Sequence, residues 1–164
     1  MATIAITPDQ DAVALEIHIA APPERVFQAI TDPRQLLQWW GQKGMYRCTQ
    51  WSTDVRPGGQ WRSEGVSDQD GSPFHVGGEY LEVDPPRRLA YTWNASWCSH
   101  LKTVVQWDLE STSGGTLARV RHSGFAGDAA QATGHRQGWE RVISWMQAFV
   151  EQGITVADRP APKQ

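Results

Sequence analysis

The sequence predicts an α+β domain in which a curved antiparallel sheet of about seven strands packs against one long C-terminal helix, with two short helices after the first strand. Three observations lead to this fold class. Apolar residues alternate near the N-terminus, six further strand-like segments follow between residues 45 and 124, and an apolar stripe with helical spacing comes after residue 125. Helices segregated from one antiparallel sheet are typical of the α+β class. A chain of 164 residues is long enough to bury a core as one domain.

The first strand is predicted over residues 13–19. Val13, Leu15, Ile17 and Ile19 occupy every second position, so they share the buried face of a half-buried strand. The chain before this strand, residues 1–12, is expected to be a polar lead-in.

Two short helices are predicted next. Prolines are tolerated in a first helical turn, so Pro22 and Pro23 suit the start of a helix. Asp32 and Pro33 then end this helix and begin a second one that runs from residue 34 to Trp40. Adjacent helical residues point about 100° apart, so at most one of Trp39 and Trp40 is expected to face the core.

Turn signals divide the middle of the chain into strands. The six segments expected to form them are 45–55, 60–66, 74–83, 88–94, 102–109 and 116–122. Short connections that contain glycine or proline indicate antiparallel hairpins. In the first connection, Gly58 and Gly59 predict a tight turn with at least one residue at positive φ.

The last helix is expected to run to about residue 152, where Gly153 is a natural stop. Its apolar stripe consists of Trp139, Val142, Ile143, Met146, Phe149 and Val150. We therefore divide the chain into a lead-in (1–12), a single domain (13–152) and a flexible polar tail (153–164).

Composition excludes several classes of protein. The formal net charge is −3 and no basic stripe is present, so nucleic acid is not an expected partner. No apolar run approaches the roughly 18 residues of a membrane span, and the N-terminus does not resemble a signal peptide. Cys48 and Cys98 lack metal-ligand spacing. We expect a cytoplasmic protein with reduced thiols and no metal or cofactor, although spacing alone leaves one disulfide open.

Nine tryptophans are the unusual feature of the composition. They indicate either a solid aromatic core or a cavity with aromatic walls. Strand parity places Tyr91 and Trp93 on one face and Trp107 on the corresponding face of the next strand, toward the long helix. The residues predicted to contact a ligand are Trp40, Trp61, Tyr91, Trp93, Trp107, His122, Trp139, Ile143 and Met146.

His122 is the one histidine that parity places inside, because it shares a strand face with Ala118 and Val120. An inward histidine could serve as a general base or orient a ligand. The competing interpretation is a buried histidine satisfied by a backbone carbonyl or water. No catalytic residue and no metal ligand is assigned.

Five segments resemble the SRPBCC superfamily (the START and Bet v 1 proteins), and within it the AHSA1-like branch, named after an activator of the Hsp90 ATPase. Residues 21–33 resemble its opening helix and 36–41 its Trp-Trp-Gly helix end. Residues 56–61 resemble its Gly-Gly-x-Trp hairpin, 77–93 its Gly-x-Tyr strand pair with two prolines, and 138–139 its Gly-Trp pair. The resemblance covers roughly residues 13–152. It implies the helix-grip fold, with a hydrophobic cavity between sheet and long helix.

Three functions are compatible with this resemblance. The first is binding of a small apolar or aromatic molecule, with the long helix and the loop around Trp97 to Leu101 controlling entry to the cavity. The second is a cyclase-like or hydrolase-like enzyme that uses His122 and Tyr91 in the same cavity. The third is a protein-binding domain with an Hsp90-type partner, which is disfavoured because the Hsp90 activator has a further N-terminal domain. A homodimer is left open.

Overall fold

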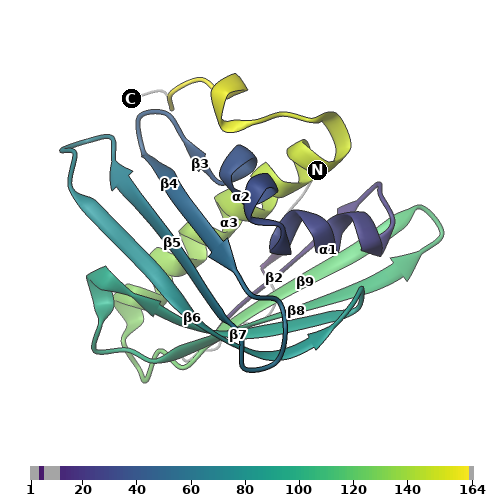
Figure 1. Cartoon of the computed structure of the whole chain (residues 1–164), viewed down its shortest axis with the longest axis horizontal. Coiled ribbons are helices and arrows are strands. Elements are labelled where there is room, and N and C mark those ends of the chain that lie inside the picture. The colour runs from purple at the N-terminus through teal and green to yellow at the C-terminus, as the bar shows by residue number, and fades with distance from the viewer. Residues whose placement is uncertain (1–3, 6–11, 163–164) are drawn as a thin grey trace.

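The computed structural model describes residues 4–5 and 12–162, and its central feature is one curved antiparallel sheet crossed by a long helix (Figure 1). Within this part of the chain the strand order is β1-β2-β9-β8-β7-β6-β5-β4-β3. Every neighbouring pair of strands is antiparallel. The predicted α+β class and the arrangement of sheet and helix are therefore confirmed.

The seven predicted strands all form, with ends that differ from prediction by up to three residues. They are β2 (Ala12–Ile19), β4 (Tyr46–Thr53), β5 (Gln60–Ser67), β6 (Pro73–Asp84), β7 (Arg88–Ala95), β8 (Thr103–Thr112) and β9 (Gly115–Ser123). The sheet also contains β1 (Ile4–Ala5) and β3 (Gly41–Gln42) at its two edges. Two-residue strands are too short to leave a periodic signal in the sequence.

Three α-helices follow the predicted order: α1 (Pro23–Thr31), α2 (Pro33–Trp39) and α3 (Ala129–Gln152). Two short 3₁₀ helices are added, η1 (Ser96–Cys98) and η2 (Val156–Asp158). The C-terminus of α3 is capped by Gly153 at φ 70°, in the left-handed region that glycine adopts readily.

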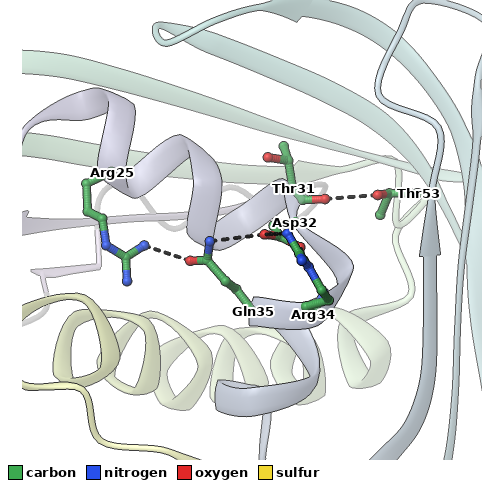
Figure 2. A network of polar contacts seen from close by, with 6 residues as sticks. All are labelled: Arg25, Thr31, Asp32, Arg34, Gln35 and Thr53. Carbon is green, nitrogen blue, oxygen red and sulfur yellow. Dashed lines mark hydrogen bonds and ion pairs between the residues drawn. The ribbon is translucent and has the colours of Figure 1, made fainter.

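Asp32 joins the first two helices. Its backbone N–H donates to the Gln28 carbonyl at the end of α1, and its carboxylate accepts the Arg34 N–H (3.0 Å) that opens α2. The same carboxylate accepts a hydrogen bond from the Gln35 amide (3.2 Å), which in turn accepts one from Arg25 (2.7 Å), as Figure 2 shows. An aspartate at this position satisfies backbone donors that a helix start leaves free.

Both tryptophans at the end of α2 are buried, so the prediction that at most one of them faces the core is wrong. Trp39 is 0% exposed and Trp40 8%. The helix ends at Trp39, and Trp40 has extended backbone angles (φ −88°, ψ 112°), so the helical 100° separation does not apply between them. The indole of Trp39 donates to the Ala29 carbonyl (2.8 Å), and that of Trp40 to the Tyr46 hydroxyl (3.0 Å).

The chain after α3 folds back onto the domain through Arg159, where the sequence predicts a flexible polar tail. The buried guanidinium donates to the carbonyls of Trp39, Gly41 (2.8 Å) and Trp145 (3.2 Å), and stacks over the Trp145 ring. Burial lowers the pKa of Arg159 to about 10, so the side chain stays charged at neutral pH. Three carbonyl dipoles contact the charge directly, and the Asp158 carboxylate adds a favourable electrostatic interaction.

The turn between β4 and β5 has the predicted glycine geometry. Gly58 has φ +85°, and the Gly59 N–H donates to the Arg56 carbonyl at 2.8 Å, which closes a four-residue turn. A Cβ on Gly59 would overlap the carbonyl oxygen of Asp54. Gly58 is therefore required for its backbone angle, and Gly59 for the close approach of the chain.

We expect Gly58→Ala to lower the free energy of unfolding by about 1–2 kcal/mol, the cost of a left-handed alanine. Gly59→Ala should cost more, because its methyl group overlaps backbone that cannot move without breaking the hairpin. Urea denaturation of the two variants measures both values. A Gly59→Ala variant as stable as the parent would contradict the close approach.

We expect Arg159→Ala to lower the free energy of unfolding by about 2 kcal/mol or more, since it removes charge-assisted hydrogen bonds to buried carbonyls. Arg159→Lys should recover only part of the loss, because an ammonium group cannot reproduce the guanidinium fork. Arg34→Ala is the matched control, as its side chain is 90% exposed and should change stability by no more than about 0.5 kcal/mol. Equal effects of Arg159→Ala and Arg34→Ala would show that the C-terminal segment is not anchored.

Candidate functional site

A pocket of about 480 Å³ lies between α3 and the half of the sheet formed by β4, β5, β6 and β7. This volume falls within the range of small-molecule sites in proteins. Seven aromatic residues line it: Trp40, Tyr46, Trp51, Phe74, Trp93, Trp97 and Trp139. Exposed residues, among them Trp97 and Gly134, also line it, so the pocket opens to solvent.

Two glycines on α3 leave part of the helix side of the pocket free of side chains. Gly134 and Gly138 are four residues apart, so they lie on the same helix face, and both line the pocket. A Cβ built on either would meet no atom within 4 Å. Neither glycine is needed for close packing, although each lowers helix stability by about 1 kcal/mol relative to alanine. The result of having glycine here is open space over the helix.

The structure brings three of the nine predicted ligand-contacting residues to the pocket wall: Trp40, Trp93 and Trp139. Ring centroids place Trp139 5.9 Å from Trp40 and 5.8 Å from Trp93. The three rings therefore form one continuous aromatic surface.

The other six predicted residues, Trp61, Tyr91, Trp107, His122, Ile143 and Met146, do not line this pocket. Trp61, Tyr91 and Trp107 pack together beside it around a void of only about 10 Å³. The Trp107 indole donates to the Tyr91 hydroxyl (3.1 Å). Both interpretations of the tryptophans hold in part, because one end of the interior is a solid aromatic core and the other end is open.

His122 is inward, as parity predicts, and is 0% exposed. Its Nδ1 accepts from the Trp139 indole (2.9 Å), so Nε2 carries the proton and donates to the Thr103 hydroxyl (2.7 Å). Thr103 donates onward to the Trp93 carbonyl (2.9 Å). The partners are side chains rather than the backbone carbonyl or water expected. Burial, with a smaller effect of His135, lowers the pKa of His122 well below its ordinary value.

The sequence prediction missed most of the pocket wall on β4. Tyr46 and Cys48 share a strand face, but a bulge between Cys48 and Gln50 shifts the register, so Trp51 also reaches the pocket. Parity counting cannot detect such a bulge. The sequence does contain one signal for the position of the pocket, the pair Gly134 and Gly138 in the last helix. Glycine lowers the stability of a helix interior, so two of them on one face indicate a packing or functional reason.

Three buried nitrogen atoms on the pocket wall have no hydrogen-bond partner among the described residues: Nε1 of Trp51, Nε1 of Trp93 and Nε2 of His135. The Nδ1–H of His135 donates to the Gln131 carbonyl (2.8 Å), which leaves Nε2 as an acceptor. Burial lowers the pKa of His135, and the bond to Gln131 opposes this only in part. Unsatisfied buried polar groups are rare, so their concentration at one pocket indicates a functional region.

The remaining titratable groups of the wall are neutral except one. Burial raises the pKa of the Cys48 thiol to about 11, against a smaller opposing effect of the Ser63 hydroxyl. Burial likewise raises the pKa of Tyr46. Arg141, which is exposed, is the charged side chain among the described residues that line the pocket.

Three further observations concern metal ligands, cysteine thiols and membrane-spanning helices. Among residues 4–5 and 12–162, no group of three His, Cys, Asp or Glu side chains is placed to hold a metal ion. Cys48 and Cys98 are both free thiols. Within the same residues no helix combines the length and apolar character needed to cross a lipid bilayer.

Comparison with protein families gives one match. The family model described as Activator of Hsp90 ATPase homolog 1-like protein matches residues 20–151. None of the curated proteins matches the chain significantly.

Several solved structures share the fold. Protein CV1439 from Chromobacterium violaceum is 28% identical, with a TM-score of 0.79 over 87% of this chain and 99% of that one. A Rhodobacter sphaeroides protein is 21% identical, with a TM-score of 0.80 over 91% and 98%. An AHSA1-like protein from Aeromonas hydrophila is 21% identical, with a TM-score of 0.70 over 85% and 91%.

We expect the free energy of unfolding to fall as the pH is lowered below about 6.5, the pKa of an unfolded histidine. In that range the unfolded chain binds a proton at His122 and the folded chain does not, so the unfolded state gains stability. His135 acts in the same direction. The slope should reach about 1.4 kcal/mol per pH unit for each neutral histidine. Urea denaturation between pH 7.5 and 5.5 measures it.

Long-range ¹H–¹⁵N NMR of the imidazole rings provides the matched test. His122 should appear as the neutral Nε2–H tautomer at a pH where free imidazole in the same sample is fully protonated. A protonated His122 ring in the folded protein would contradict the hydrogen-bond assignment.

Proposed function

Since the chain belongs to the family of Activator of Hsp90 ATPase homolog 1-like proteins, we propose that it binds a small hydrophobic, aromatic molecule in the pocket between α3 and the sheet. The observation that carries this proposal is a space of about 480 Å³ with seven aromatic residues on its wall. A well-formed apolar pocket with a few convergent polar groups is the usual form of a small-molecule site.

The energetics of the pocket favour a flat apolar ligand. Apolar burial contributes about 25 cal/mol per Å², and aromatic faces add a preference for stacked or edge-on rings. Ring surfaces of Trp40, Trp93 and Trp139 are already fixed by mutual contacts, so little side-chain entropy is lost when a ligand binds.

Trp97 stands at the mouth of the pocket. It is 50% exposed, and its ring stacks on His135 (centroids 6.0 Å apart) and meets Phe74 edge-on (6.0 Å). An exposed tryptophan held by two pocket residues is well placed to cover a bound ligand. We assign it this role, in line with the expectation from the sequence that the chain around Trp97 controls access.

The two alternatives have less support. An enzyme using His122 and Tyr91 would need their polar atoms free in the pocket, but both residues lie outside it and both are hydrogen-bonded within the core. A docking surface for a chaperone would need a contiguous apolar patch. The exposed large hydrophobic residues among those described, Leu37, Val55, Leu81 and Trp97, come from four different segments.

We expect Gly138→Leu to weaken ligand binding without loss of stability. The leucine side chain would enter the open space over the helix, and leucine is the better helix former by up to about 1 kcal/mol. The probe is N-phenyl-1-naphthylamine, a neutral aromatic dye, whose fluorescence should rise saturably with about micromolar affinity for the parent protein. Gly138→Leu should weaken this affinity at least about tenfold, a loss of about 1.4 kcal/mol.

Gln137→Leu is the matched control, because residue 137 is exposed on the same helix and does not line the pocket. It should leave the affinity for the dye unchanged. Equal binding by the parent and Gly138→Leu, with both proteins folded, would place the dye elsewhere and overturn the proposed pocket.

A further inference from the structure

The charge of the pocket is not explained by its aromatic walls. Arg141 is the charged residue among the described residues that line the pocket, and no aspartate or glutamate lies among them. Its guanidinium makes no hydrogen bond or ion pair with a described residue. Seven other arginines in the described chain form ion pairs. The described residues that line the pocket therefore carry a net positive charge, with no acidic side chain among them.

Helix geometry places Arg141 next to the open space over Gly138. Gly134, Gly138, Arg141 and Trp145 are spaced by four, three and four residues, so they form one stripe along α3. Arg141 thus follows the open space over Gly138 by less than one helical turn. A ligand resting on Gly138 would have one end beside the guanidinium.

Tyr46 supplies a hydrogen-bond donor at the same end. Its ring contacts Trp145 of the stripe (centroids 6.0 Å apart), and its hydroxyl accepts from the Trp40 indole at 3.0 Å. Among the described residues no acceptor takes the hydroxyl proton in return, and Tyr46 lines the pocket. Burial raises the pKa of Tyr46, while Arg141 and Arg159 oppose this only in part, so the hydroxyl remains a donor.

We propose that the ligand is a flat aromatic carboxylic acid. Its ring packs over Gly138 against Trp93 and Trp139, and its carboxylate pairs with Arg141 and accepts a hydrogen bond from the Tyr46 hydroxyl. This inference rests on the proposed function and names its substrate class.

The chemistry favours a carboxylate over other anions. A guanidinium and a carboxylate are both planar and pair through two parallel hydrogen bonds. One arginine balances one negative charge, whereas a phosphate monoester would bring close to two. Because Arg141 is exposed, the pair forms at the pocket mouth, where the carboxylate keeps part of its water and the cost of desolvation is small.

Two probes of nearly the same shape test the inference on the parent protein. The first is 2-naphthoate, and the second is 2-acetonaphthone, in which a neutral methyl ketone replaces the carboxylate. We expect isothermal titration calorimetry to show 2-naphthoate binding about tenfold more tightly, as one charge-assisted contact predicts. Added salt should reduce this difference, since the pair lies at the surface.

Variants then test whether Arg141 causes the difference in affinity between 2-naphthoate and 2-acetonaphthone. Arg141→Gln should bring the affinity for 2-naphthoate down to that for 2-acetonaphthone and leave the ketone unchanged. Arg136→Gln removes the same charge from α3 outside the pocket and is the matched control, with no more than about a twofold effect through long-range electrostatics. Tyr46→Phe should weaken 2-naphthoate more than 2-acetonaphthone.

The outcomes separate the two proposals. Equal affinities of the parent protein for both naphthalenes would overturn the carboxylate site and leave the aromatic pocket intact. Equal losses in Arg141→Gln and Arg136→Gln would show a general effect of charge and would also overturn it. If neither probe nor N-phenyl-1-naphthylamine binds, the proposed function itself fails.

Discussion

Trp139 connects the long helix to the sheet, and the arrangement of the interior depends on it. Its ring lies 5.8 Å from Trp93 and 5.6 Å from Trp107, and its indole N–H donates to buried His122. These contacts set the separation between α3 and the strands below it. On the side of Trp93 this separation leaves a pocket, whereas on the side of Trp107 the aromatic rings fill the space.

The pocket stays open because the helix presents glycine where a core helix would present leucine. A close-packed interior normally leaves few voids larger than a water molecule. Here Gly134 and Gly138 remove side chains from the helix face, and large indoles on the opposite wall resist collapse through their mutual contacts. The stability given up by two glycines in a helix is about 2 kcal/mol. Such a cost is understandable if the space itself has a use.

Burial also determines the chemistry of this interior. His122 and His135 have lowered pKa values, and Cys48 and Tyr46 have raised ones, so all four are neutral at physiological pH. The exposed guanidinium of Arg141 lies at the mouth of the pocket. The contrast between a neutral aromatic interior and a cationic rim is suited to a molecule with one apolar and one anionic end. The inward histidine that strand parity predicts, His122, uses both ring nitrogens in hydrogen bonds within the core.

Local sequence patterns correctly predict the fold class, the seven long strands, the three helices and the inward direction of Trp93, Trp107 and His122. These follow from local rules, because hydrophobic period and turn residues act over a few positions. Which of the inward residues line the pocket and which fill the core depends on how distant segments pack together. That outcome depends on the bulge in β4, the extended backbone of Trp40 and the distance between helix and sheet. Each of these is set by contacts between segments far apart in the chain, which no local pattern records.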